Sequence, residues 1–391
     1  SPIILNSPND DNLYYLEYDG KNTYTLKMIE NSDNKSVSNP RIVKTYKGPR
    51  GDATINLGKK INSDIILGNA NGSIYRTDAF PSMNSENLVE ITKDIYSKIY
   101  DTEPHEDDFL FLTSSAVYKS SYDTGVVDKM ASTTGETSFI SYKDGLILFS
   151  KETRNPVKYL NLATKTSETL FTPKNSIQSL NIYGDIILEL EASSTVNTYD
   201  MESKTLKEVL SGMGIHDAVL CDDGKVYIAK SSSTSPASPL ISVDPKTLET
   251  VPLKMPGQVT YGLSTNGTTI YGINLQASEN DSITYVFAFN TITKSLQNIL
   301  KFSEEDPAAF TYIFDDYLYT NIGKNKVYSY NLTQKKRFAY DRTASMPKKI
   351  CRNDRRVVIL NDNGSISWAG STSQKLMADW YLTKDGEWFE F

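Results

Sequence analysis

The segment YGDIILELEASSTVNTYDMESKTLKEVL, residues 183–210, contains the two turn patterns that decide the fold. A turn at Gly184 and Asp185 precedes the apolar run IILEL, and a second turn after Asp200 separates TVNTY from TLKEVL. Gly tolerates positive φ, and Asn or Asp side chains hydrogen-bond the nearby backbone, so these residues favour tight turns. The segment therefore reads as short strands joined by polar turns.

Both turns recur along the chain. Positions equivalent to Asp200 are Asp123, Asn161, Asp244, Asn290 and Asn331, with a weaker copy at Asp78. Positions in the acidic or glycine turn are Asp144, Asp185, Asp223, Asn266, Asp316 and Asp354. The steps are about 40 to 45 residues, the length of one four-stranded propeller blade. No stretch keeps a helical periodicity over about 12 residues.

Four-stranded sheets repeated radially bury their faces against one another and leave only short edges. We therefore predict an all-β chain that forms a single closed β-propeller domain over residues 1–391. Eight blades is the favoured count, with seven or nine as alternatives. The C-terminal segment 378–391 reads as strand, Asp-Gly turn and strand, and residues 12–20 read as strands without a clear partner. We predict that the two ends share the closing blade.

The repeated turn pattern resembles the broad β-propeller group that includes lactonase-like and quinoprotein-like repeats. The resemblance covers nearly the whole chain and implies the fold. The Trp-Asp ending of WD40 blades and the Ser-x-Asp box of sialidase-like propellers are absent, and SYDTG at 121–125 matches only a fragment of the quinoprotein signature. The resemblance therefore implies no subfamily and no functional residue.

The charge and hydropathy of the chain exclude some classes of partner. The net charge is −7 and no basic stripe is present, so no nucleic-acid partner is expected. No apolar run approaches the roughly 18 residues that cross a bilayer. Because the sequence begins at Ser1 rather than Met, we expect that an N-terminal piece was removed, whether a signal, an anchor or a tag. Together with the binding role favoured below, this leads us to predict an extracytoplasmic location: periplasmic, cell-surface or secreted.

The residues that usually carry catalysis are sparse. His105 lies in the polar segment EPHEDD, His216 opens the segment HDAVLC, and no Gly-x-Ser-x-Gly motif is present, so we predict no catalytic residue. Cys221 and Cys351 occupy equivalent places in repeats three blades apart. Because a disulfide needs Cα atoms within about 7 Å, we predict two buried, unbridged thiols.

Paired acidic residues raise the question of calcium, which takes six to eight oxygen ligands. The pairs are Asp107 with Asp108, Asp222 with Asp223, and Asp315 with Asp316. Each pair occupies the same turn of its own repeat, which favours turn formation over metal binding. We therefore predict no metal site and no cofactor, with a single calcium ion as the alternative.

Three longer segments mark one face of the predicted propeller: Ser231 to Pro239, Leu275 to Ser282, and Ser303 to Ala308. Binding residues commonly lie on loops held by a rigid scaffold. We predict a ligand-binding surface on this face formed by Ser231, Ser235, Glu279, Asp281, Glu304, Glu305 and Asp306.

The sequence favours a non-catalytic binding or scaffold module with a protein or glycan partner. The first alternative is a metal-dependent propeller enzyme of the lactonase or lyase type, with carboxylates around the central channel. The second is the ectodomain of a longer, membrane-anchored protein.

Overall fold

A computed structural model describes residues 2–5, 12–30, 40–47, 55–61, 64–69, 74–78, 89–90, 96–105, 108–121, 126–192, 194–232, 237–277, 282–302, 308–322, 326–340, 346–371, 380–383 and 388–390. These residues form 38 β-strands, arranged as eight four-stranded sheets and one sheet of six strands. All neighbouring strands pair in antiparallel fashion, as in the first sheet. The predicted all-β fold is confirmed. Within these residues, no helix is long and apolar enough to cross a membrane.

Successive sheets are formed by successive groups of strands along the chain. The first two sheets contain β1 (Ile3–Ile4), β2 (Leu13–Tyr18), β3 (Thr23–Ile29) and β4 (Arg41–Lys47), then β5 (Ile55–Ile61), β6 (Asp64–Asn69), β7 (Ile74–Asp78) and β8 (Val89–Glu90). The next three contain β10 (Asp101–His105), β11 (Asp108–Leu112), β12 (Ala116–Ser121) and β13 (Val127–Ser132), then β14 (Ser138–Tyr142), β15 (Gly145–Phe149), β16 (Val157–Asn161) and β17 (Ser167–Phe171), then β18 (Ile177–Tyr183), β19 (Ile186–Glu191), β20 (Thr195–Asp200) and β21 (Thr205–Ser211).

The remaining four sheets complete the chain. They contain β22 (Ile215–Leu220), β23 (Val226–Lys230), β24 (Leu240–Val243) and β25 (Thr250–Leu253), then β26 (Val259–Thr265), β27 (Thr269–Ala277), β28 (Ser282–Asn290) and β29 (Leu296–Phe302), then β30 (Ala308–Phe314), β31 (Tyr317–Ile322), β32 (Lys326–Asn331) and β33 (Lys336–Ala339). The six-stranded sheet contains β34 (Pro347–Arg352), β35 (Arg356–Asn361), β36 (Ile366–Gly370), β37 (Trp380–Thr383), β38 (Trp388–Glu390) and β9 (Tyr96–Ser97).

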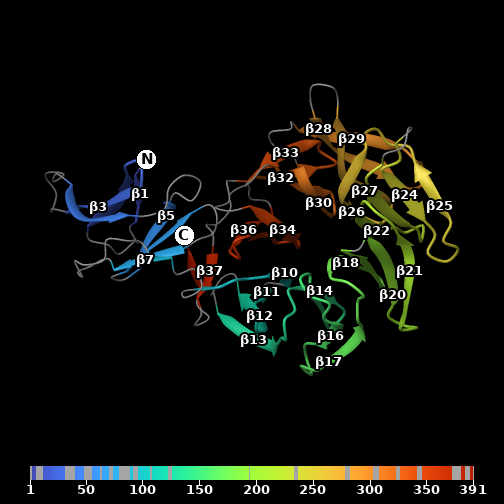
Figure 1. Cartoon of the computed structure of the whole chain (residues 1–391), viewed down its shortest axis with the longest axis horizontal. Coiled ribbons are helices and arrows are strands. Elements are labelled where there is room, and N and C mark those ends of the chain that lie inside the picture. Colours follow the sequence, from blue (N-terminus) through green and yellow to red (C-terminus); the bar gives the residue numbers. More distant parts are fainter. Residues whose placement is uncertain are drawn as a thin grey trace.

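Seven sheets, from β10 to β38, form a closed ring (Figure 1). The first strand of each sheet contacts the first strand of the next, and β10 contacts β34 and β35, which closes the circle. The sheets β1–β4 and β5–β8 contact each other through β1 and β5 and lie to one side of the ring in Figure 1. The structure is thus a propeller of four-stranded blades. The favoured count of eight falls between the seven sheets of the ring and the nine sheets formed by the described residues.

The closing sheet differs in detail from the prediction. It takes in the C-terminal strands β37 and β38, as expected, but the strand it recruits from the earlier part of the chain is β9, through Leu382 opposite Ser97. The N-terminal segment Leu13–Tyr18 instead forms β2, between β1 and β3. The carboxylate of Asp19 accepts three backbone N–H groups and so stabilises the turn between β2 and β3. The backbone groups along one edge of β2 are therefore hydrogen-bonded to β3, its neighbour in the sequence.

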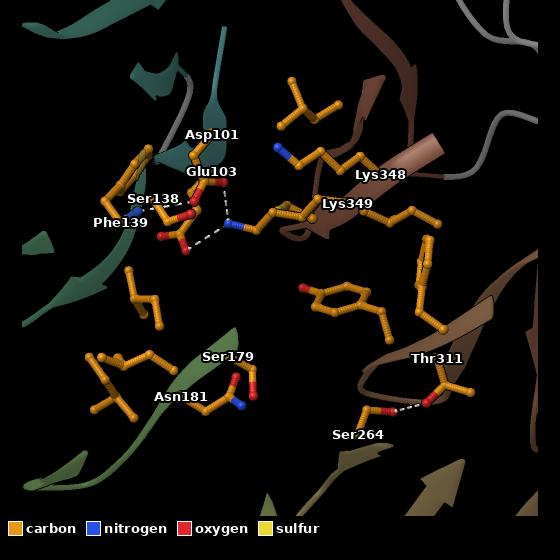
Figure 2. A pocket seen from close by; sticks show the side chains of 18 of the residues that line it. Asp101, Glu103, Ser138, Phe139, Ser179, Asn181, Ser264, Thr311, Lys348 and Lys349 are labelled. Carbon is orange, nitrogen blue, oxygen red and sulfur yellow. Dashed lines mark hydrogen bonds and ion pairs between the residues drawn. The ribbon is translucent and has the colours of Figure 1, made fainter. Parts of the chain in front are cut away.

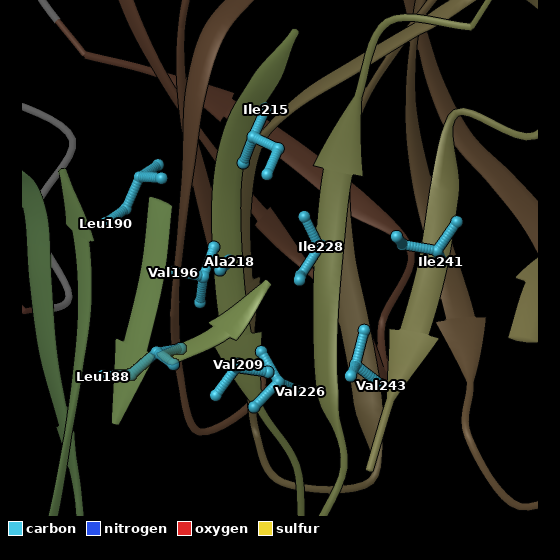
Figure 3. Packing of buried hydrophobic residues seen from close by; sticks show 10 residues of the cluster. All are labelled: Leu188, Leu190, Val196, Val209, Ile215, Ala218, Val226, Ile228, Ile241 and Val243. Atoms are coloured by element: carbon cyan, nitrogen blue, oxygen red, sulfur yellow. The ribbon is translucent and has the colours of Figure 1, made fainter. Parts of the chain in front are cut away.

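Apolar side chains hold neighbouring sheets of the ring together, one cluster for each interface. Leu188, Leu190 and Val196 of one sheet meet Ile215 and Ile228 of the next (Figure 3). A cluster of the same kind joins the first and last sheets of the ring, and its members are Ile99, Phe109, Phe111, Val358, Leu360, Ile366 and Trp368. Each fully buried side chain of this size contributes about 1.5 to 3 kcal/mol relative to exposure. The ring therefore closes on the same kind of core that joins its other sheets.

The repeated Asn or Asp residues form the predicted turns. Asp200 accepts the backbone N–H groups of Glu202 and Ser203 at 2.9 Å, and Asp244 makes the equivalent bonds to its own turn. In each such turn the fourth residue after the Asn or Asp has a positive φ; these residues are Lys165, Lys204, Leu248, Lys294 and Lys335. Asp123 and the residues that follow Asp78 lie outside the described residues, so these two predicted turns are not described.

Candidate functional site

A cavity of about 640 Å³ occupies the centre of the ring (Figure 2). Its wall includes residues from the first strand of every sheet in the ring; one from each is Asp101, Ser138, Ser179, Asp217, Gly262, Thr311 and Lys349. This volume lies within the range of about 300 to 1,000 Å³ that is typical of small-molecule sites. The wall also carries many hydroxyl and amide groups, which can bond a polar ligand.

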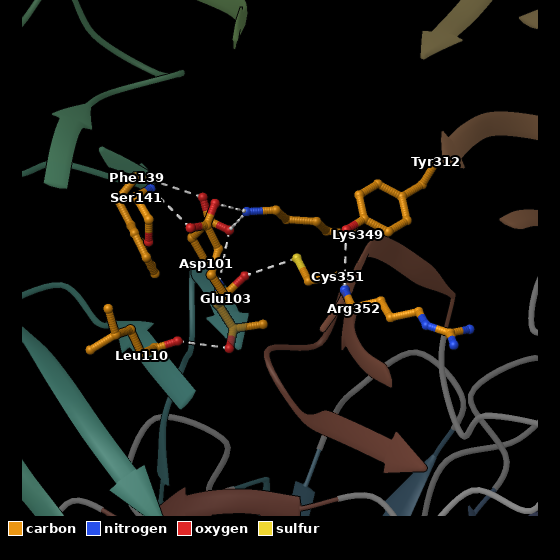
Figure 4. A network of polar contacts seen from close by, with 10 residues as sticks. Asp101, Glu103, Leu110, Phe139, Ser141, Tyr312, Lys349, Cys351 and Arg352 are labelled. Atoms are coloured by element: carbon orange, nitrogen blue, oxygen red, sulfur yellow. Dashed lines mark hydrogen bonds and ion pairs between the residues drawn. The ribbon is translucent and has the colours of Figure 1, made fainter. Parts of the chain in front are cut away.

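One side of the cavity is lined by an ion-pair network between the first and last sheets of the ring (Figure 4). Lys349 Nζ lies 2.7 Å from Asp101 Oδ1 and 3.5 Å from Glu103 Oε1. Asp101 also accepts the N–H of Phe139 at 3.0 Å, and Glu103 that of Ser141 at 2.9 Å. Burial alone would lower the pKa of Lys349, but the Asp101 and Glu103 carboxylates hold it well above its usual value. This cluster connects three consecutive sheets, and the two carboxylates neutralise the charge of Lys349.

A second lysine enters the cavity next to the first because of a β-bulge. Pro347 pairs with Asn361 and Lys349 with Leu360, so Lys348 is an extra residue in β34. Bulges re-aim side chains that would otherwise alternate across the sheet. Figure 2 shows the side chains of Lys348 and Lys349 both extending into the pocket.

Besides Arg352, whose guanidinium donates to Tyr319 and lies over the Tyr317 ring, the cations of the pocket wall that stand apart from the Lys349 network are Lys348 and Lys151. Neither forms an ion pair with any residue that the structure describes, although both line the cavity. Partial desolvation lowers the pKa of both ammonium groups, and the charge of Lys349 adds to this effect. Lys151 follows β15 in the connection to β16, at the end of the ring where the first strands begin. The cavity therefore offers two cationic groups without partners to an anionic ligand.

The cavity also contains a carboxylate that is held but not neutralised. Asp217 accepts the N–H of Ala218 at 2.9 Å and that of Leu263, in the next sheet, at 2.7 Å. It forms no ion pair within the described part of the chain. Burial raises the pKa of Asp217 to about 6, although the two backbone N–H groups and the charge of Lys151 lower it.

The residues predicted from the sequence are described only in part. Ser231 is exposed, lies opposite Val259 in an isolated bridge, and its Oγ is 2.7 Å from His216 Nε2. The other predicted binding residues lie outside the described residues, and they are Ser235, Glu279, Asp281, Glu304, Glu305 and Asp306. The loop surface therefore remains a prediction. Its loops connect β23 to β24, β27 to β28 and β29 to β30, and so share the end of the ring at which Lys151 lies.

The predictions for the cysteines and the acidic pairs can also be compared with the structure. Cys221 and Cys351 are buried and free, as predicted. Burial raises their thiol pKa values to about 11 and about 12. Among the residues that the structure describes, no group of three or more His, Cys, Asp or Glu side chains could hold a metal ion. Asp223 bonds the N–H of Lys225, which is a turn contact of the kind expected.

The sequence analysis did not identify the charged residues that line the central cavity. Asp101, Asp217, Lys348 and Lys349 all stand near the start of a first strand, at the end opposite the acidic turn. The signal in the sequence was only a charged residue within the first three positions of each of these strands. Lys151 carried no comparable signal, because it lies in a connection between strands.

Comparisons with known proteins agree with this fold. A family described as a domain of unknown function, DUF5074, matches residues 106–332, and one described as an uncharacterised protein matches residues 312–383. An uncharacterized protein of Treponema pallidum (strain Nichols) is 23% identical over 210 residues, which cover 51% of this chain and 32% of that protein. The chain thus spans about a third of the length of this curated relative.

Solved β-propellers are similar in structure. Oligogalacturonate lyase from Vibrio parahaemolyticus has a TM-score of 0.54 at 11% identity, over 75% of this chain and 96% of that one. The tricorn protease has a TM-score of 0.52 at 10% identity, over 96% of this chain and 42% of that one. At these identities the similarity establishes the fold alone.

Proposed function

The chain belongs to the family described as domain of unknown function DUF5074, and we propose that it is a binding propeller that takes an acidic group of its ligand into the central cavity. The ligand is a small acid, or the acidic end of a protein or glycan partner. The observation that supports this proposal is the pair of lysines, Lys151 and Lys348, that face the cavity without ion-pair partners among the described residues.

Energetics favour a ligand at this place. Lys151 and Lys348 are both partly desolvated, which lowers their pKa values, and no described carboxylate contacts them in return. A carboxylate or phosphate in the cavity would form charge-assisted hydrogen bonds, each of which contributes about 1.5 to 3 kcal/mol. The hydroxyl and amide groups of Ser179, Asn181 and Thr311 line the same cavity and can bond the rest of the ligand.

The test begins with a glycan and peptide array, followed by titration calorimetry of the acidic ligands that bind. Replacing both channel lysines (Lys151→Ser with Lys348→Ser) should weaken their affinity at least tenfold. The affinity of the unaltered protein should also fall as the salt concentration rises, because salt screens the ion pairs.

A matched control removes the same charge elsewhere. Lys246 lies in the exposed turn between β24 and β25, and Lys336 is exposed in β33, so neither lines the cavity. The double variant Lys246→Ser with Lys336→Ser should bind as the unaltered protein does. Equal affinities for the two double variants would contradict the proposal.

A further inference from the structure

The carboxylates of Asp101 and Asp217 make the same set of backbone contacts in two places on the ring. Each accepts the N–H of the residue that follows it, Thr102 at 2.9 Å or Ala218 at 2.9 Å. Each also accepts an N–H from the first strand of the next sheet, Phe139 at 3.0 Å or Leu263 at 2.7 Å. The two carboxylates are therefore held in equivalent positions, three sheets apart.

They differ in the residue that reaches them from the preceding sheet. Lys349 follows the bulge of β34 and binds Asp101 at 2.7 Å. The equivalent position before Asp217 belongs to β18, where a bulge of the same register places Ser179 opposite Leu190. Ser179 lines the cavity, but its hydroxyl is short and uncharged. The place that an ammonium group fills at Asp101 is therefore filled by no side chain from β18 at Asp217.

No other described cation takes that place. Lys151 interacts electrostatically with Asp217 but forms no ion pair with it, and it faces the cavity. A partly buried carboxylate such as Asp217 is destabilised when it has no cation, and a bound ammonium or guanidinium group would compensate its charge. Asp217 and the two channel lysines line one cavity, so one small molecule can contact both kinds of charge.

We propose that Asp217 binds the ammonium group of a zwitterionic ligand, an amino acid or short peptide, whose acidic group is held by Lys151 and Lys348. The ligand's ammonium group occupies the position at Asp217 that Lys349 occupies at Asp101. This inference rests on the proposed function, which supplies the acidic half of the ligand, and adds the cationic half.

The first test uses the unaltered protein and two matched sets of probes. Glycine, diglycine, triglycine and tetraglycine vary the separation of the two charges, and their N-acetylated counterparts keep the carboxylate but lose the ammonium group. Titration calorimetry should show, for at least one length, that the free amine binds at least tenfold more tightly than the acetylated form. No preference for the free amine at any length would overturn the inference.

Two variants then place the preference at Asp217. Asp217→Asn should remove the preference for the free amine while leaving the affinity of the acetylated peptide within about twofold, and circular dichroism reports whether the variant is folded. Ser179→Lys offers a second route that keeps Asp217. The new ammonium group should bind Asp217 as Lys349 binds Asp101, raise the melting temperature and abolish the free-amine preference. A preference that survives in folded Ser179→Lys would contradict the assignment.

The two proposals fail in different ways. If acetylated peptides bind and respond to the loss of Lys151 and Lys348, but acetylation itself changes nothing, only the role of Asp217 is wrong. If acidic ligands bind equally well with and without the two lysines, the proposed function is wrong as well.

Discussion

Replacing Glu189 with Gln should remove a pH dependence of stability that this one side chain creates. Glu189 lies in β19 and is fully buried. Its Oε2 accepts a hydrogen bond from Asn197 at 3.0 Å, but its Oε1 has no partner among the described residues. Burial raises the pKa of Glu189 from 4.5 to about 7; the charge of Glu191 adds to the effect, and the hydrogen bond from Asn197 opposes it. The folded protein thus favours the protonated acid.

The size and sign of the effect follow from that pKa. Each pKa unit corresponds to about 1.4 kcal/mol, so the difference between 4.5 and about 7 corresponds to about 3 kcal/mol. The stabilisation is complete below pH 4.5, where the carboxyl is protonated in both the folded and the unfolded chain. It is lost as the pH rises through about 7, because the unfolded chain ionises freely and the folded chain must ionise a buried group.

Urea unfolding between about pH 4.5 and 8.5 measures the effect directly. The free energy of unfolding of the unaltered protein should fall by about 3 kcal/mol more than that of Glu189→Gln over this range. Gln keeps the oxygen that accepts the bond from Asn197. Asp217 titrates in both proteins, and its contribution cancels in the difference. Glu202→Gln, which alters an exposed carboxylate in the turn after Asp200, is the control and should run parallel to the unaltered protein. Parallel curves for Glu189→Gln would refute the reasoning.

Two further predictions concern the ring and its turns. Lys349→Met should lower the free energy of unfolding by about 3 kcal/mol, since it leaves the buried Asp101 without its cation; Lys348→Met, which breaks no described ion pair, should cost less than about 1 kcal/mol in the same urea titration. Leu248→Gly should raise the melting temperature, because φ is 62° at Leu248 and a left-handed backbone costs a non-glycine residue about 1 to 2 kcal/mol. Lys246→Gly in the same turn should lower it, because this residue has no positive φ to relieve and glycine adds backbone freedom to the unfolded chain.

The repeat could be predicted because its chemistry is local. Asn161, Asp200 and Asp244 bond N–H groups two and three residues ahead, so the turn is encoded within a few positions of the chain. Short apolar runs between such turns predict four-stranded sheets wherever they occur. The positive φ at Lys204 and Leu248 was not predictable in this way, because neither residue type favours it.

The closure of the ring was less accessible to sequence reasoning. The earlier strand in the closing sheet is β9, only two residues long, and pairing it with β37 joins positions 97 and 382. A two-residue strand carries no periodicity, and nothing local distinguishes it from a loop. The longer segment Leu13–Tyr18 was the stronger strand in the sequence, but its own hairpin with β3 satisfies its backbone first.

The candidate site could not be predicted from local sequence patterns either, because it depends on residues that neighbouring sheets contribute. Asp101 and Asp217 look alike in the sequence, as acids near the start of a strand, and the structure shows that their backbone contacts are also alike. The two sites differ in the residue at the equivalent register position of the preceding sheet, which is Lys349 for Asp101 and Ser179 for Asp217. Asp101 is neutralised by Lys349 of its own chain, whereas we propose that Asp217, which has no such cation, binds the ammonium group of a ligand. On this proposal, one residue in the preceding sheet decides whether the acid has a structural or a binding role, and Ser179→Lys changes that residue alone.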